Sequence, residues 1–176
     1  IKGAALEAIK QGLSPLLVSG DKGKLSYKRP NHKWKDLQRK ALTTQELEEL
    51  LEGKTIRPEF EYEDKGEKKY GITFWPPKVW MLGTATGSVS GSLEVVDVDT
   101  KHDNTGTLWL DLETLIKDNL PDLYPLLTIS KTQSGGRHLL YRCERIEGNK
   151  KLSNRPATAE ELEVDPNEKQ LCTIET

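Results

Sequence analysis

The stretch Leu93-Glu94-Val95-Val96-Asp97-Val98-Asp99 carries the strongest local signal in the chain. Its valines predict a β-strand, and side chains two positions apart in a strand project from the same face. We therefore expect Asp97 and Asp99 to lie together at the end of the strand, with Val96 and Val98 packed on the other face. Paired carboxylates suit a divalent cation such as Mg²⁺ or Mn²⁺. Strand-end acids that only face solvent are the alternative.

Helical spacing of leucines and strand-like apolar runs predict the elements that follow this strand. In order, they are a helix that opens at Gly106 and ends before Pro121, a hairpin of strands over 126–130 and 138–143, a short helix opened by a capping box at Thr158–Glu161, and a last strand over 171–176.

The N-terminal half predicts a similar mixture of elements. They are a helix over 1–11, a buried strand over 13–19, a loop over 20–37, a helix opened by the capping box Thr43–Glu46, and a hairpin over 59–74 with one aromatic and one charged face. That aromatic face either covers the core or offers a stacking surface for single-stranded nucleic acid. Helices mixed with several hairpins favour an α+β fold over a doubly wound parallel sheet.

Two further motifs carry polar groups at strand ends. Ser134-Gly135-Gly136-Arg137-His138 precedes an apolar strand, and its glycines allow close backbone approach to a ligand. Its arginine and histidine could donate hydrogen bonds to a phosphate. A plain hairpin turn is the alternative. Glu175 ends the last apolar strand and could supply a third carboxylate to a metal site.

Composition narrows the class of protein. The chain has 176 residues with 31% charged side chains, and no apolar run reaches the length of a membrane span. It begins with Ile and carries no signal peptide, so we expect a fragment of a cytoplasmic protein. Its two cysteines exclude a disulfide framework. A net charge of −2 argues against a general polyanion binder, but basic blocks at 21–40 and 131–155 could hold an anion locally.

In this order the motifs resemble the primase-polymerase (prim-pol) domain of the archaeo-eukaryotic primase superfamily, found in plasmid and phage replication proteins and in CRISPR-associated prim-pols. Asp97 and Asp99 match the family's strand ending in Asp-x-Asp/Glu, and Ser134 to His138 match its Ser-x-His-like turn. Glu175 matches the third strand-end acid, where Asp is commoner. Upstream matches are Gly12, Pro15, Lys28-Arg29-Pro30, Trp34 and the glycines between Gly83 and Gly91.

The resemblance implies an RRM-like catalytic β-sheet packed against an N-terminal αβ module, with the active site in the cleft between them. Residues 1–176 would form one catalytic domain. It would consist of a module of about 1–58, a variable hairpin insertion over 59–78, and an acidic and histidine-containing core over 79–176.

The implied activity is DNA primase and polymerase activity, a nucleotidyl transfer that uses nucleoside triphosphates, a single-stranded DNA template and a primer. Asp97, Asp99 and Glu175 would be the catalytic residues and would hold two Mg²⁺ or Mn²⁺ ions. Nucleotide would be bound by Ser134, Arg137, His138, Lys28 and Lys101. A downstream helicase or accessory domain is the implied partner, and no membrane is involved.

Two other functions remain open on the residues alone. Metal-dependent glycosyltransferases also place an Asp-x-Asp after a strand, although their chemistry does not need the Ser-Gly-Gly-Arg-His turn. A non-catalytic module that binds single-stranded nucleic acid would leave the acids as surface residues.

Overall fold

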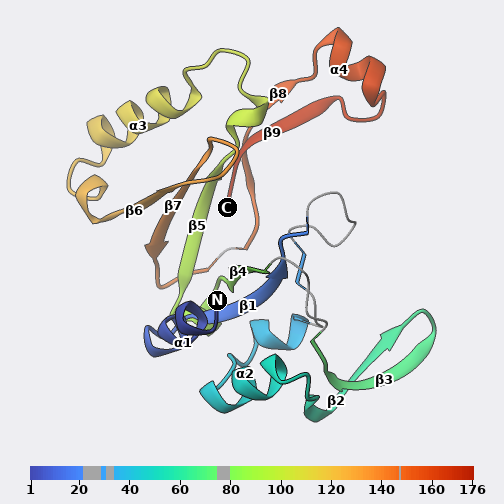
Figure 1. Cartoon of the computed structure of the whole chain (residues 1–176). Coiled ribbons are helices and arrows are strands. Elements are labelled where there is room, and N and C mark those ends of the chain that lie inside the picture. Colours follow the sequence, from blue (N-terminus) through green and yellow to red (C-terminus); the bar gives the residue numbers. More distant parts are fainter. Residues whose placement is uncertain (22–28, 31–33, 75–79, 147) are drawn as a thin grey trace. The chain divides into compact units, whose positions relative to one another are not determined.

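The computed structural model describes residues 1–21, 29–30, 34–74, 80–146 and 148–176. These residues form two compact units, Ile1–Ser92 and Leu93–Thr176, which we treat in turn. Figure 1 labels their elements. Within the described ranges, four α-helices and three antiparallel sheets confirm the predicted α+β class.

Two small antiparallel sheets and two helices make up the N-terminal unit. Its elements are α1 (Lys2–Lys10), β1 (Ser14–Ser19), the 3-10 turn η1 (Lys35–Gln38), α2 (Thr44–Leu51), β2 (Ile56–Asp64), β3 (Glu67–Ile72), β4 (Trp80–Ala85) and the 3-10 turn η2 (Ser88–Ser90). Strand β1 pairs with β4, and β2 pairs with β3. The predicted capping box of Thr43 and Glu46 is present at the start of α2.

Strand β1 lies in the core of this unit, and every one of its residues is buried. Leu17 belongs to the same buried cluster as Leu37 and Leu47. A buried polar residue needs hydrogen-bond partners. Ser14 has two, because its N–H donates to Ser90 Oγ (2.8 Å) and its hydroxyl donates to the carbonyl of Leu37 (3.1 Å). These bonds connect β1 to both 3-10 turns.

A buried arginine joins β2 to α2 and to the segment before it. The Arg57 side chain is only 4% exposed, and all five of its N–H donors have acceptors. It donates to the carboxylates of Asp36 (2.6 Å) and Glu46 (2.7 and 3.0 Å) and to the carbonyls of Lys40 and Ala41. The Arg57 backbone has φ +47°, a conformation that side chains other than glycine rarely adopt.

The β2–β3 hairpin was predicted correctly, but its single aromatic face was not. Phe60 and Tyr62 stack on one face with ring centroids 5.8 Å apart. Tyr70 pairs with Glu61, so its ring lies on the opposite face, and it is 58% exposed. The prediction failed because the turn sets which β3 residue faces each β2 residue, and composition does not reveal that register.

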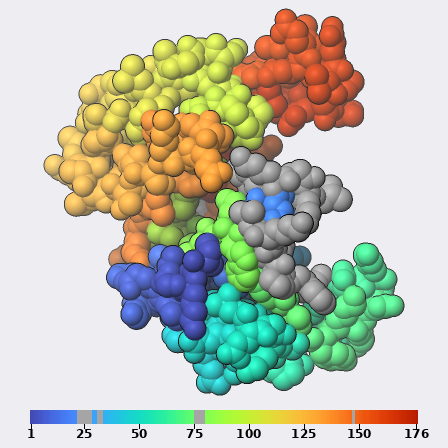
Figure 2. Space-filling model, in the orientation of Figure 1, coloured from blue at the N-terminus to red at the C-terminus, as the bar shows by residue number. Residues whose placement is uncertain are grey.

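A five-stranded sheet dominates the C-terminal unit. Its elements are β5 (Leu93–Val98), the 3-10 turn η3 (Thr100–His102), α3 (Leu108–Asn119), the 3-10 turn η4 (Tyr124–Leu126), β6 (Thr128–Lys131), β7 (Arg137–Arg142), β8 (Lys151–Pro156), α4 (Ala159–Val164) and β9 (Gln170–Glu175). The strand order is β6-β7-β5-β9-β8, and every pair is antiparallel. Helix α4 forms a projection at the end of this unit (Figure 2).

The two faces of this sheet differ in character. Val98 and Leu139 are almost fully buried on the face beside α3. Arg137 lies on that same face, with its guanidinium 5.4 Å from the centre of the Trp109 ring in α3. Because side chains alternate along a strand, Asp97 and His138 belong to the other face.

Most predicted elements of this unit are present, but strand β8 was not expected from the sequence. None of the helices in the described ranges combines the length and hydropathy that a membrane span requires.

Candidate active site

One row of paired residues crosses the sheet near the end of β5. From β6 to β8, the row contains Ser130, His138, Asp97, Glu175 and Lys151. Directly paired residues in antiparallel strands share a face and have Cβ atoms about 5 Å apart. Strand pairing therefore brings the predicted acids Asp97 and Glu175 together with His138, although they are distant along the chain.

Asp97 occupies the middle of this row. His138 Nε2 lies 3.6 Å from Asp97 Oδ1, and both side chains are about two-fifths exposed, at 43% and 42%. Burial raises the pKa of the Asp97 carboxyl above its ordinary value; His138 opposes this rise, while Asp99 and Glu175 add to it. Asp99 and Glu175 are thus each close enough to repel the charge of Asp97, which favours binding of a cation beside Asp97.

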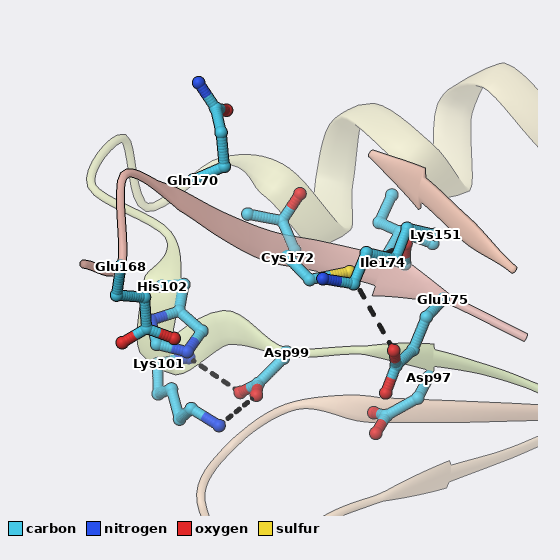
Figure 3. A pocket seen from close by; sticks show the side chains of 11 residues that line it. Asp97, Asp99, Lys101, His102, Lys151, Glu168, Gln170, Cys172, Ile174 and Glu175 are labelled. Atoms are coloured by element: carbon cyan, nitrogen blue, oxygen red, sulfur yellow. Dashed lines mark hydrogen bonds and ion pairs between the residues drawn. The ribbon is translucent and has the colours of Figure 1, made fainter. Parts of the chain in front are cut away.

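Asp99 lies one residue beyond β5, and its carboxylate points toward Lys101. The Lys101 ammonium lies 2.5 Å from Asp99 Oδ2, and the Lys101 backbone N–H donates to Oδ1 at 3.3 Å. The Asp99 N–H donates to the carbonyl of Thr173 in β9. Figure 3 shows Asp97 and Glu175 facing one another, with Asp99 turned away to Lys101.

The Ser-Gly-Gly turn lies beside the end of β5. Gly135 has φ +96°, and a Cβ at Gly136 would lie 2.4 Å from the carbonyl oxygen of Val98. Glycine is therefore required for the turn to approach β5 this closely. Ser134 is exposed in the turn, with its Oγ 3.2 Å from Thr132 Oγ1.

One of the predicted nucleotide-binding residues lies on the opposite face of the sheet from Asp97 and His138. Arg137 lies on the α3 face, where its guanidinium donates to the carbonyls of Gly135 (2.6 Å) and Gly136 (3.1 Å). Its position follows from strand alternation, because it immediately precedes His138. Lys28 lies outside the described residues.

A pocket of about 160 Å³ opens beside the carboxylates. Its lining residues are Asp97, Asp99, Lys101, His102, Lys151, Glu168, Gln170, Cys172, Thr173, Ile174 and Glu175. Sequence reasoning missed Lys151, Glu168 and Gln170 as site residues. Lys151 lies in the basic block 131–155, but only the unexpected strand β8 brings it opposite Glu175.

Only two of the three carboxylates are arranged as expected for ligands of a divalent cation. Asp97 and Glu175 offer oxygens that face one another, whereas the Asp99 oxygens are engaged by Lys101. Across the part of the chain that the structure describes, no group of three or more His, Cys, Asp or Glu side chains is arranged to hold a metal ion. A cation bound by all three acids would therefore lie next to the positive charge of Lys101 at Asp99.

Comparison with known protein families places the chain in one of them. The model of the family described as bifunctional DNA primase/polymerase, N-terminal, matches residues 5–173. The chain belongs to this family. No curated protein and no solved structure matches the chain.

Membership in the bifunctional DNA primase/polymerase family indicates the general activity of the chain. At the family level, it implies a nucleotidyltransferase-type enzyme that acts on nucleotides and DNA in replication. The match spans both compact units, so it includes β5, the Ser-Gly-Gly turn and β9 up to Thr173. The predicted resemblance to the prim-pol domain is therefore confirmed.

Proposed function

We propose that this chain catalyses template-directed nucleotidyl transfer, which synthesises and extends primers on single-stranded DNA from nucleoside triphosphates. A 3′-hydroxyl attacks the α-phosphate of the incoming nucleotide, and pyrophosphate leaves. The observation that carries the proposal is the strand register that sets Asp97 between His138 and Glu175 beside a polar pocket. The family match supports the same reaction.

Asp97, Asp99 and Glu175 are the residues that would hold two Mg²⁺ or Mn²⁺ ions. When bound, such ions lower the pKa of the attacking hydroxyl and neutralise charge on the phosphates. The protein supplies carboxylates fixed on neighbouring strands. Their mutual repulsion contributes to the raised pKa of Asp97, after the larger effect of burial, and a positive charge among them would relieve that repulsion.

Neutral and cationic donors around the carboxylates would orient the triphosphate. His138 stands beside Asp97, so a phosphate that reaches the carboxylates also comes within range of the imidazole. The Ser134 hydroxyl and the Lys101 ammonium add donors near the end of β5, and charge-assisted bonds to phosphate are the stronger kind. Arg137 would act indirectly, because its guanidinium supports the turn that presents Ser134.

The template and primer would be bound over the open face of an RRM-like sheet. We propose that residues 1–176 act as one catalytic domain, with the N-terminal module over about 1–58, a variable hairpin over 59–78 and the catalytic core over 79–176. A helicase or accessory domain downstream in the parent protein is the proposed partner.

Primer synthesis on single-stranded DNA with labelled nucleotides and Mn²⁺ tests this function directly. Asp97→Asn and Glu175→Gln should reduce product to background, because each removes a charge from the facing carboxylates. Asp118→Asn is the matched control, since it changes an exposed acid at the C-terminal end of α3. Full activity of Asp97→Asn would refute the proposal, and template binding by the wild type without any product would indicate a non-catalytic module.

A further inference from the structure

Asp99 is distinguished from the other two carboxylates by its partner. Its side chain is 27% exposed and lies 2.5 Å from the Lys101 ammonium, whereas Asp97 and Glu175 face one another across a strand pair. The Lys101 backbone N–H also donates to the same carboxylate, so both contacts come from one residue of η3. The ammonium is therefore tethered two positions away from the acid that it neutralises.

A tethered ammonium and a divalent cation compete for the same oxygens. The Lys101 ammonium already neutralises Asp99 and would repel a divalent cation at the same carboxylate, so the two positive charges oppose each other's binding. The lysine side chain is 58% exposed and flexible, and an exposed ion pair is worth at most about 1 kcal/mol. Such a pair is strong enough to reduce cation binding and weak enough to be displaced.

We infer that Lys101 is a positioning residue that occupies Asp99 until a nucleotide arrives, and that it couples cation binding to triphosphate binding. The inference rests on the proposed function. A triphosphate in the pocket gives Lys101 an alternative anionic partner, and Asp99 is then released to join Asp97 and Glu175. Each ligand thereby favours the other, as reciprocal coupling between two binding events requires.

The pocket offers a matched control in Lys151. This residue pairs with Glu175 in the row across the sheet and lines the same pocket, but its ammonium has no ion-pair partner among residues 1–21, 29–30, 34–74, 80–146 and 148–176. Lys101→Met and Lys151→Met each remove one positive charge and keep an aliphatic stem. Only the first of them frees a carboxylate.

The test measures free Mn²⁺ by electron paramagnetic resonance, with and without a deoxynucleoside triphosphate that carries a non-hydrolysable α,β linkage. Without nucleotide, Lys101→Met should bind Mn²⁺ about two- to fivefold more tightly than the wild type, which is the range that loss of an exposed ion pair allows. The increase in Mn²⁺ affinity should be smaller in Lys151→Met. The analogue should tighten Mn²⁺ binding more in the wild type than in Lys101→Met, because that variant has no lysine left to displace.

An equal increase in Mn²⁺ affinity in Lys101→Met and Lys151→Met would reflect the general charge of the pocket. This result would overturn the inference and leave the proposed function intact. Equal tightening by the analogue in the wild type and Lys101→Met would also overturn it. If none of the proteins binds Mn²⁺ at millimolar concentration, even with the analogue, the proposed function fails and the inference fails with it. Circular dichroism of each variant checks that the fold is unchanged.

Discussion

Replacing Glu46 by Gln should make the N-terminal unit markedly less stable at neutral pH, and this loss should disappear in acid. The hydrogen bonds from Arg57 lower the pKa of Glu46 from its usual 4.5 to about 2, against the opposing effect of burial. At about 1.4 kcal/mol per pH unit, this lowering corresponds to about 3 kcal/mol of stability. The same order of loss is measured when one partner of a buried ion pair is removed.

The direction of this pH dependence follows from whether the folded or the unfolded chain binds the Glu46 proton more tightly. The unfolded chain takes up a proton at Glu46 near pH 4.5, whereas the folded chain does so only near pH 2. The contribution of Glu46 is therefore fully present above the unfolded value and is lost as the pH falls through the folded one. Arg57 stays charged throughout this range, so it continues to favour the ionised carboxylate.

Urea unfolding, followed by tryptophan fluorescence between pH 7 and pH 2, measures this difference. Glu48→Gln is the matched control, because Glu48 belongs to the same helix and pairs with Lys2 at the surface, where its side chain is 46% exposed. The control should change stability by less than about 1 kcal/mol at every pH. The reasoning is refuted if Glu46→Gln costs no more than Glu48→Gln at pH 7, or if its cost does not shrink toward pH 2.

Two further predictions concern the site. Asp97→Asn should raise the melting temperature of the cation-free protein at pH 7, because burial and the neighbouring acids raise the pKa of Asp97 and make its ionised form unfavourable. This gain in melting temperature should vanish below pH 3.8, where the carboxyl is protonated in the unfolded and the folded chain alike. A lower melting temperature of the variant in EDTA at pH 7 would contradict the prediction. Gly136→Ala should cost about 1–3 kcal/mol, because its Cβ would meet the Val98 carbonyl oxygen at 2.4 Å. Gly3→Ala, whose Cβ meets nothing within 4 Å, is the control, and equal melting temperatures for the two glycine variants would disprove the close approach.

The elements that could be predicted from the sequence are those with local signals. The capping boxes at Thr43 and Thr158 both form as expected, because each depends on residues three positions apart. Strand β8 was missed, since Lys151–Pro156 has neither β-branched residues nor a clean alternation and is held by its pairing with β9. The buried Arg57 could not be foreseen either, because its partners lie 11 to 21 residues away.

Some residues of the candidate site could be predicted from the sequence, and others could not. The resemblance to the prim-pol family named Asp97, His138 and Glu175, and the register sets them side by side. Arg137 was grouped with His138 because the two are adjacent in sequence. In a strand that adjacency sends them to opposite faces, and the guanidinium over Trp109 follows from it. When a motif spans a turn and a strand, adjacent residues in its strand part therefore cannot be assigned to the same site.

A similar local effect explains the contact between Asp99 and Lys101. The sequence predicts a strand that continues through Asp99, but β5 ends at Val98. Asp99 has φ −92° and ψ 88° and caps η3, where the nearest donor is the N–H of Lys101. The turn that follows β5 brings the Lys101 side chain to the Asp99 carboxylate. The ion pair that we propose as a coupling device is therefore a consequence of where the strand stops.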